Sequence, residues 1–214
     1  MIDLVKDGDL WVVTINRPDK ANSLTAEMLE QLCEVFEAAT GTAVTTTAMT
    51  ATARVLILTG TGRVFSAGAD LDEARAGLAT SPLWERLSGA VAGFGGLSIA
   101  ALNGTLAGGA FGMALACDLR ISVPNARFFY PVMKLGFLPQ PSDPARMKAL
   151  IGPARAKLIL MGGQKIDAQQ ALAFGLVDRL VDGDALMDTA REIAADTLAA
   201  KPDIAAQIKV MCEG

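Results

Sequence analysis

Two glycine-containing segments hold the residues whose types and spacing are most specific for chemistry. One reads Arg63-Val-Phe-Ser-Ala-Gly-Ala-Asp-Leu71 and the other Asn103-Gly-Thr-Leu-Ala-Gly-Gly-Ala-Phe-Gly112. Each follows an apolar run typical of a buried strand, and the small residues would let a backbone N–H approach a ligand closely. We therefore predict that the amides of Ala67 and Gly109 donate to one oxygen atom.

Such a pair of amides is an oxyanion hole. A helix is predicted to begin near Gly109, and the first N–H groups of a helix lack partners and lie at its positive end. Donors directed at a thioester oxygen would stabilise an enolate, and removing one typically costs about 3 kcal/mol of transition-state stabilisation. The alternatives are a plain tight turn for the first segment and close helix packing for the second.

Composition removes several other chemistries. The 214 residues include no His, which excludes a Ser-His-Asp triad, a Cys-His dyad and a His-ligated metal. Ser66 also lacks the Gly-x-Ser-x-Gly context of a hydrolase nucleophile. Any general acid or base must therefore be Asp, Glu, Lys, Tyr or Cys.

Charge and cysteine content indicate the compartment and exclude some partners. The net charge is −4 and no long Lys/Arg run occurs, which argues against nucleic-acid or anionic-membrane binding. The three cysteines are widely spaced, which predicts no disulfide framework, no zinc site and a cytoplasmic protein. Residues 88–117 carry no charge and could pass for a membrane span, but glycines and a turn signal interrupt them. The run 60–65 lacks the third glycine of a dinucleotide-binding loop.

Strand and helix patterns alternate along the chain, which predicts an α/β fold. The expected strands are 10–15, 54–59, 97–102, 119–123, 128–130 and 177–181. The expected helices are 25–39, 83–93, 109–117, 154–161, 168–174 and 184–200, and 70–79 is either a helix or a lid. Residues 40–53 are rich in Thr and Ala and suggest a variable connector or an extra strand. We assign 1–200 to one core and 201–214 to the start of a short or truncated C-terminal helical region.

Several motifs in order resemble the enoyl-CoA hydratase/isomerase (crotonase) family over nearly the whole chain. They are Asn16-Arg-Pro-Asp-Lys-Ala-Asn-Ser-Leu24, Phe65 to Leu71, Ile99 to Gly104, Leu115 to Ile121, Pro131 to Pro139 and Ala171 to Val177. The resemblance implies an α/β spiral of β-β-α units, the ClpP/crotonase fold. It also implies an acyl-CoA thioester as partner, in fatty acid metabolism, and a homotrimer or a dimer of trimers. Coenzyme A would enter as part of the substrate, with no tightly bound cofactor and no metal.

The resemblance also implies where the thioester binds. The oxyanion amides would be those of Ala67 and Gly109. The residues expected to contact substrate or coenzyme A are Lys20, Ala21, Ala67, Gly68, Ala69, Asp70, Leu71, Gly108 and Gly109.

The chain departs from the family at the acid/base positions. Gly112 and Val132 stand where hydratases of this family carry glutamates, so classical hydration is doubtful. Tyr130 and Asp143 are the substitutes that we consider most suitable. The expected function is enolate stabilisation by a lyase, isomerase or decarboxylase. The alternatives are a non-catalytic acyl-CoA binding or carrier protein and a structural subunit of a mixed assembly.

Overall fold

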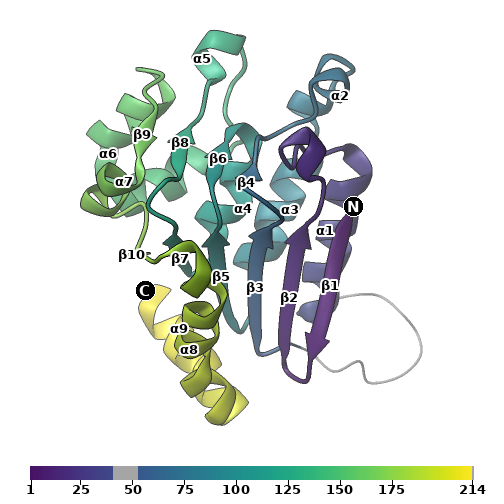
Figure 1. The fold of residues 1–214 in the computed structure, drawn as a ribbon, viewed down its shortest axis with the longest axis vertical. Helices are drawn as coiled ribbons and strands as arrows, with labels where there is room; N and C mark the ends of the chain where they lie inside the picture. The colour runs from purple at the N-terminus through teal and green to yellow at the C-terminus, as the bar shows by residue number, and fades with distance from the viewer. Residues whose placement is uncertain (41–52, 214) are drawn as a thin grey trace.

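Two β-sheets form the framework of the computed structural model, which describes residues 1–40 and 53–213 (Figure 1). Within the described residues the larger sheet has six strands, in the order β1-β2-β3-β5-β7-β10. They are β1 (Ile2–Asp7), β2 (Leu10–Ile15), β3 (Val55–Gly60), β5 (Leu97–Leu102), β7 (Leu119–Ser122) and β10 (Arg179–Leu180). All neighbours pair in parallel except β1 and β2.

A second, smaller sheet alternates with the larger one along the chain. Its described strands are β4 (Val64–Ser66), β6 (Thr105–Ala107), β8 (Arg127–Phe129) and β9 (Ile166–Asp167). The chain passes from a strand of the larger sheet to one of the smaller sheet and then into helix, in three successive turns that start at β3, β5 and β7. This confirms the predicted α/β spiral of β-β-α units.

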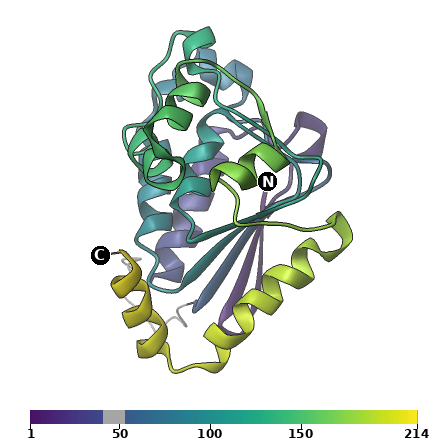
Figure 2. The same ribbon diagram turned by 90° about the vertical axis from the view of Figure 1, so that its left-hand side faces the viewer.

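Helices cover both faces of the larger sheet (Figure 2). Helices α1, α3 and α4 pack side by side on one face, and α8 packs against β3, β5 and β7. The longer helices are α1 (Ala26–Ala39), α3 (Leu83–Ala92), α4 (Phe111–Ala116), α6 (Asp143–Leu160), α7 (Ala168–Phe174), α8 (Leu186–Ala199) and α9 (Pro202–Glu213). The shorter ones are α2 (Leu71–Arg75), α5 (Val132–Leu135) and the 3-10 turns η1 (Pro18–Lys20), η2 (Leu78–Thr80), η3 (Gly108–Ala110) and η4 (Gly183–Ala185).

Local sequence explains many of these elements. The Thr25 side chain accepts from the Met28 N–H and begins α1, as a Thr at this position does in helices generally. Gly175 ends α7 in the left-handed conformation, with φ 84°. The apolar run of β3 lies between two parallel neighbours and is buried at five successive positions, because helices cover both faces of such a sheet.

Tertiary pairing accounts for the elements that the sequence analysis did not predict. Strands β4 and β6 are three residues long and have no detectable alternation of their own. Helix α6 begins well before the predicted 154, and Gly152 interrupts it with a φ of 78°. The possible extra strand in 40–53 falls almost wholly outside the described residues. The charge-free run 88–117 is divided among α3, β5, β6 and α4, and no helix in the described ranges is long and apolar enough to cross a bilayer.

Candidate active site

Three neighbouring strand ends bring the predicted site segments together. Strands β4, β6 and β8 pair in parallel, and the carboxyl ends of parallel strands meet at one edge of a sheet. The segments that follow them are 67–70, 108–112 and 130–132. The first two are in close contact, because a Cβ placed on Gly68 would lie 2.9 Å from the Ala107 carbonyl oxygen. Gly68 also has a φ of 91°, which favours glycine.

The amide that the first segment offers is that of Ala69, not Ala67. The Ala67 N–H donates to the Ala21 carbonyl at 3.0 Å, and the Asp70 N–H donates to the Leu24 carbonyl at 2.8 Å. Leu24 and Ala69 form a parallel bridge, in which the Ala69 N–H points away from residues 21–24. Among the described residues the Ala69 N–H has no acceptor. The predicted donation by the Ala67 N–H is therefore wrong, because that N–H already donates to the Ala21 carbonyl.

The second segment places Gly109 at the beginning of a helical stretch, as predicted. Gly109 lies in η3, which leads directly into α4, and no side chain caps this end. Its N–H has no acceptor in the described part of the chain. A Cβ on Gly109 would lie 3.1 Å from the indole ring of Trp84, and the Trp84 Nε1–H donates to the Leu78 carbonyl at 2.8 Å. The ring is thus held in place, and a Cβ at 109 would crowd it, which favours glycine there.

Asn22 holds the first segment in position, a role that the sequence analysis did not assign. Its side chain is fully buried, accepts from the Arg17 N–H, and donates to the Thr61 and Val64 carbonyls at 2.9 and 2.7 Å. Its own carbonyl accepts from the Ser66 hydroxyl at 2.8 Å. Asn22 also has a φ of 53°, a region that Asn tolerates better than most residues. Asn22 lies within the Asn16 to Leu24 motif, so the sequence did contain a signal for this positioning role.

The residues expected to contact coenzyme A lie around the same strand ends. Lys20 closes η1 and is exposed, and Leu71 begins α2 with a relative exposure of 71% for the whole residue. Asp70 is engaged elsewhere, since its carboxylate caps α2 and accepts from the Arg17 guanidinium at 2.7 Å. That hydrogen bond holds the pKa of Asp70 below its usual range. Asp70 therefore has a positioning role in this structure.

The vacant glutamate positions have different surroundings. Val132 begins α5 and is buried in the hydrophobic core. Gly112 lies on α4, where a Cβ would come within 3.0 Å of Asp143 Oδ1. The hydroxyl of Tyr130 donates to Asp143 Oδ2 at 2.9 Å. The two residues suggested as acid/base substitutes are thus hydrogen-bonded to each other, beside one of the two vacant positions.

Burial sets the protonation of this pair. Desolvation raises the pKa of Asp143 from 3.8 to about 7, although the Tyr130 hydrogen bond and the Arg146 charge oppose it. Desolvation and the neighbouring carboxylate raise the pKa of Tyr130 above its usual value. Tyr130 therefore stays protonated as the donor, and Asp143 changes charge near neutral pH. A group with such a pKa can both accept and return a proton.

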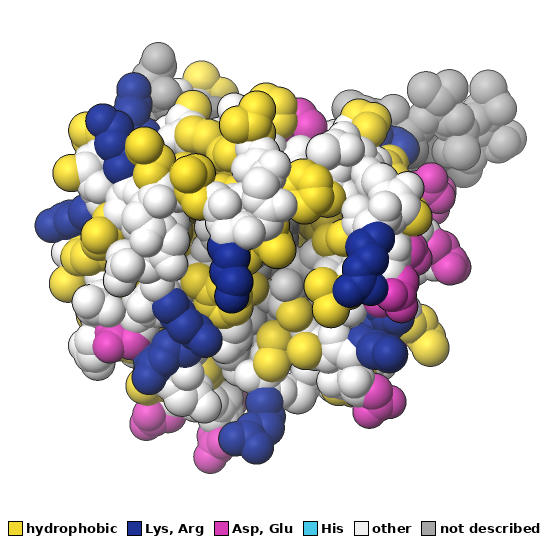
Figure 3. Space-filling model, turned by 90° about the horizontal axis from the view of Figure 1, so that it is seen from above, with side chains coloured by type: hydrophobic (Ala, Val, Ile, Leu, Met, Phe, Trp, Pro, Cys, Tyr) yellow, Lys and Arg dark blue, Asp and Glu magenta, His cyan; other side chains and the backbone are white. Residues whose placement is uncertain are grey.

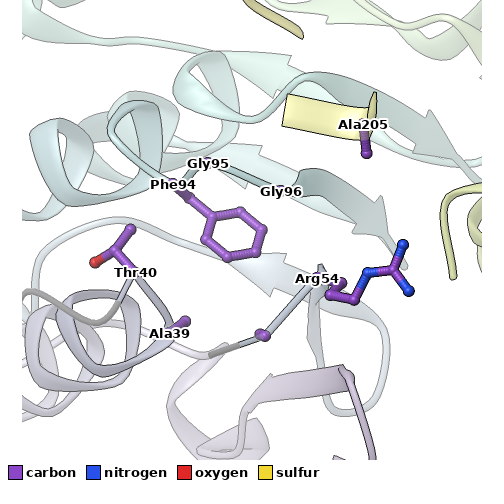
Figure 4. A pocket seen from close by; sticks show the side chains of 8 residues that line it. Ala39, Thr40, Arg54, Phe94, Gly95, Gly96 and Ala205 are labelled. Atoms are coloured by element: carbon purple, nitrogen blue, oxygen red, sulfur yellow. The ribbon is translucent and has the colours of Figure 1, made fainter. Parts of the chain in front are cut away.

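A separate cavity of about 200 Å³ lies at the opposite ends of the strands. Arg54 and Gly96, which precede β3 and β5, line it together with Phe94, whose ring projects between Thr40 and Arg54 (Figure 4). Ligands in α/β sheets bind beyond the carboxyl ends of the strands. We therefore place the candidate site at Ala69, Gly109 and Asp143 and not in this cavity.

The two-sheet spiral with adjacent donor loops at its strand ends defines an α/β protein of the crotonase fold. The chain belongs to the enoyl-CoA hydratase/isomerase family, whose sequence model, described as "Enoyl-CoA hydratase/isomerase", matches residues 6–213.

Curated relatives and solved structures agree with this assignment. Carnitinyl-CoA dehydratase from Citrobacter koseri is 35% identical over 97% of this chain and 78% of its own length. Short-chain-enoyl-CoA hydratase from Clostridium acetobutylicum is 35% identical over 89% of this chain and 72% of its own length. The crystal structure of enoyl-CoA hydratase from Bacillus anthracis superposes with a TM-score of 0.88 at 31% identity, covering 100% of this chain and 82% of that one.

Proposed function

We propose that this chain binds an acyl-CoA thioester and stabilises its enolate with the amides of Ala69 and Gly109. The observation that carries the proposal is the pair of adjacent N–H groups without acceptors in the described residues. As a proton or carboxylate leaves the α-carbon, negative charge develops on the thioester oxygen. Two fixed donors stabilise that charge, and so does the positive N-terminal end of the helical stretch that begins at Gly109 and continues as α4.

The surface around the strand ends suits such a ligand. Seen from above, this end of the molecule carries apolar side chains between separate basic ones (Figure 3). The exposed apolar residues of α2, α5 and the loop after α5 are Leu71, Met133, Leu135, Phe137 and Leu138. Coenzyme A combines phosphates with an apolar acyl chain, so both kinds of side chain have a partner in it. The residues proposed to contact it are Lys20, Ala21, Gly68, Ala69, Leu71 and Gly108.

The names of the relatives favour lyase-type chemistry, since they include a dehydratase and a hydratase. The usual two-glutamate route to hydration is absent, because Gly112 and Val132 cannot transfer protons. Isomerisation and decarboxylation need fewer protein groups and fit the amide pair equally well. The same vacancies favour a second candidate, an acyl-CoA carrier without turnover. We further propose a homotrimer or a dimer of trimers as the assembly.

Calorimetric titration with acetoacetyl-CoA tests the proposal, because this thioester readily forms an enolate. The informative variant is Gly68→Ala, since a Cβ at Gly68 would push the two donor loops apart. The matched control is Gly89→Ala, where a Cβ meets no atom within 4 Å. We expect wild type and G89A to bind alike and G68A to bind at least tenfold more weakly. Failure of wild type to bind, or equal binding by G68A, would overturn the proposal.

A further inference from the structure

One buried atom near the donor loops has no partner in the structure. Asp143 is fully buried, and its Oδ2 accepts from Tyr130 while its Oδ1 has no hydrogen bond. Buried polar atoms are nearly always hydrogen-bonded, and an unpaired carboxylate oxygen is costly. The exception calls for an explanation.

Helix capping does not explain the unpaired oxygen of Asp143. Asp143 is the first residue of α6, directly after the N-cap Ser142, where an acidic side chain can interact with the positive end of the helix. Neither carboxylate oxygen accepts from a backbone amide in the described residues. The Asp143 side chain instead points back toward Tyr130 and α4.

The free oxygen faces the vacant position on α4. Oδ1 lies 3.0 Å from where a Cβ of Gly112 would be, so a side chain at 112 would crowd it and the carboxyl would have to give by a few tenths of an ångström. Gly112 follows Gly109 by three residues, which is roughly 5 Å along the helix axis. The α- and γ-carbons of an enoyl thioester lie a few bond lengths from its carbonyl oxygen. A thioester oxygen at the Gly109 amide would thus bring those carbons toward Oδ1.

The surroundings hold this carboxyl in one orientation. The ring of Tyr130 stacks on Phe111, with centroids 5.5 Å apart, and its hydroxyl fixes Oδ2. Two charged groups, Glu85 of α3 and Arg146 of α6, lie near Asp143. Both are bound to the preceding residue, Ser142: its N–H donates to Glu85, and its hydroxyl accepts from Arg146. Their opposite charges act on the pKa of Asp143 in opposite directions, with Glu85 raising it and Arg146 lowering it.

We propose that Asp143 is the acid/base residue of this chain, substituting for the glutamate missing at Gly112, and that it moves a proton between the α- and γ-carbons of an enoyl-CoA. The proposal rests on the proposed function. Starting from a 3-enoyl-CoA, the α C–H bond breaks and the proton forms an O–H bond with Oδ1. The electron pair is delocalised onto the thioester oxygen, held by the amides of Ala69 and Gly109. Return of the proton to the γ-carbon gives the 2-enoyl-CoA, so no further reactant is needed. Tyr130 is a positioning residue.

The test follows the conversion of 3-hexenoyl-CoA by the ultraviolet absorbance of the conjugated product. Asp143→Asn keeps the shape and an acceptor for Tyr130 but cannot take a proton. Asp188→Asn, on the exposed surface of α8, is the matched control. We expect wild type and D188N to convert the substrate to the conjugated 2-enoyl thioester and D143N to lose at least 100-fold in rate. Binding of acetoacetyl-CoA should be retained in all three.

Two further variants separate catalysis from folding. The double variant Gly112→Glu with Asp143→Gly moves a carboxyl to the neighbouring backbone and should recover part of the rate, whereas a structural role of Asp143 predicts no recovery. Tyr130→Phe removes a hydrogen bond that lowers the pKa of Asp143, so its pH–rate midpoint should move upward. The inference is overturned if D143N keeps the wild-type rate, or if wild type binds acetoacetyl-CoA yet forms no conjugated product from 3-hexenoyl-CoA. Loss of binding in wild type would instead overturn the proposed function.

Discussion

The buried carboxyl of Asp143 makes stability depend on pH in an unusual direction. Its pKa is raised from 3.8 to about 7 by burial, so the folded protein holds a proton that the unfolded chain releases. A raised carboxyl pKa contributes stability that is fully present below about pH 4 and is lost as pH rises through about 7. The free energy of unfolding of wild type should therefore fall between pH 5 and pH 8.

The magnitude follows from linkage. Titration of one group between these two pKa values lowers the free energy of unfolding by about 2.5 kcal/mol from pH 5 to pH 8. For a chain of this size that corresponds to roughly 5–10 °C in melting temperature. The chain contains no histidine, the side chain that ordinarily titrates in this range. The raised thiol pKa values of Cys33 and Cys117, about 11 and 12, act only at higher pH.

Urea unfolding followed by circular dichroism at fixed protein concentration measures the effect. Wild type should lose stability steadily from pH 5 to pH 8, and Asp143→Asn should give a nearly flat line. Asp188→Asn should follow wild type. A flat wild-type line would refute the reasoning, as would an undiminished slope in D143N, because either result would show that Asp143 titrates normally in the folded protein.

Two other predictions concern residues that position the site and α9. Asn22→Ala leaves the Arg17 N–H and the Thr61 carbonyl without their partner, and the Val64 carbonyl with only Asn103. It should lower the free energy of unfolding by about 3 kcal/mol, and a loss no larger than that of exposed Asn125→Ala would contradict this. Lys209 donates to the Phe94 and Gly96 carbonyls and to Asp118. Lys209→Met should speed hydrogen exchange across α9 at least tenfold, measured by mass spectrometry, while equal exchange in K209M and exposed Lys201→Met would show that these contacts do not hold the helix.

Under the proposed function, the amides of Ala69 and Gly109 and the single buried carboxyl of Asp143 would together do without the usual glutamates. A carboxyl at 143 reaches the helix from the side, and glycine at 112 leaves the space that it occupies. The cost is an unpaired oxygen in the core. Functional sites are where such local conflicts with stability are expected.

The sequence by itself determined the strand–helix alternation, the positions of the two glycine-containing loops and the absence of glutamate at Gly112 and Val132. These features follow from local patterns: apolar runs, turn residues and the identities of single side chains. The predicted ends of helices 25–39 and 168–174 agree with the caps at Thr25 and Gly175, because capping depends on neighbours within one turn.

Only the tertiary structure decided which amide is free and which carboxyl faces the site. Ala67 and Ala69 are equally small in the sequence, but pairing with residues 21–24 uses the N–H of Ala67 and leaves that of Ala69. Asp143 approaches Gly112 because β8 and α6 bring distant segments together around Tyr130. Both outcomes depend on hydrogen bonds and packing between segments far apart in the chain, which no local pattern encodes.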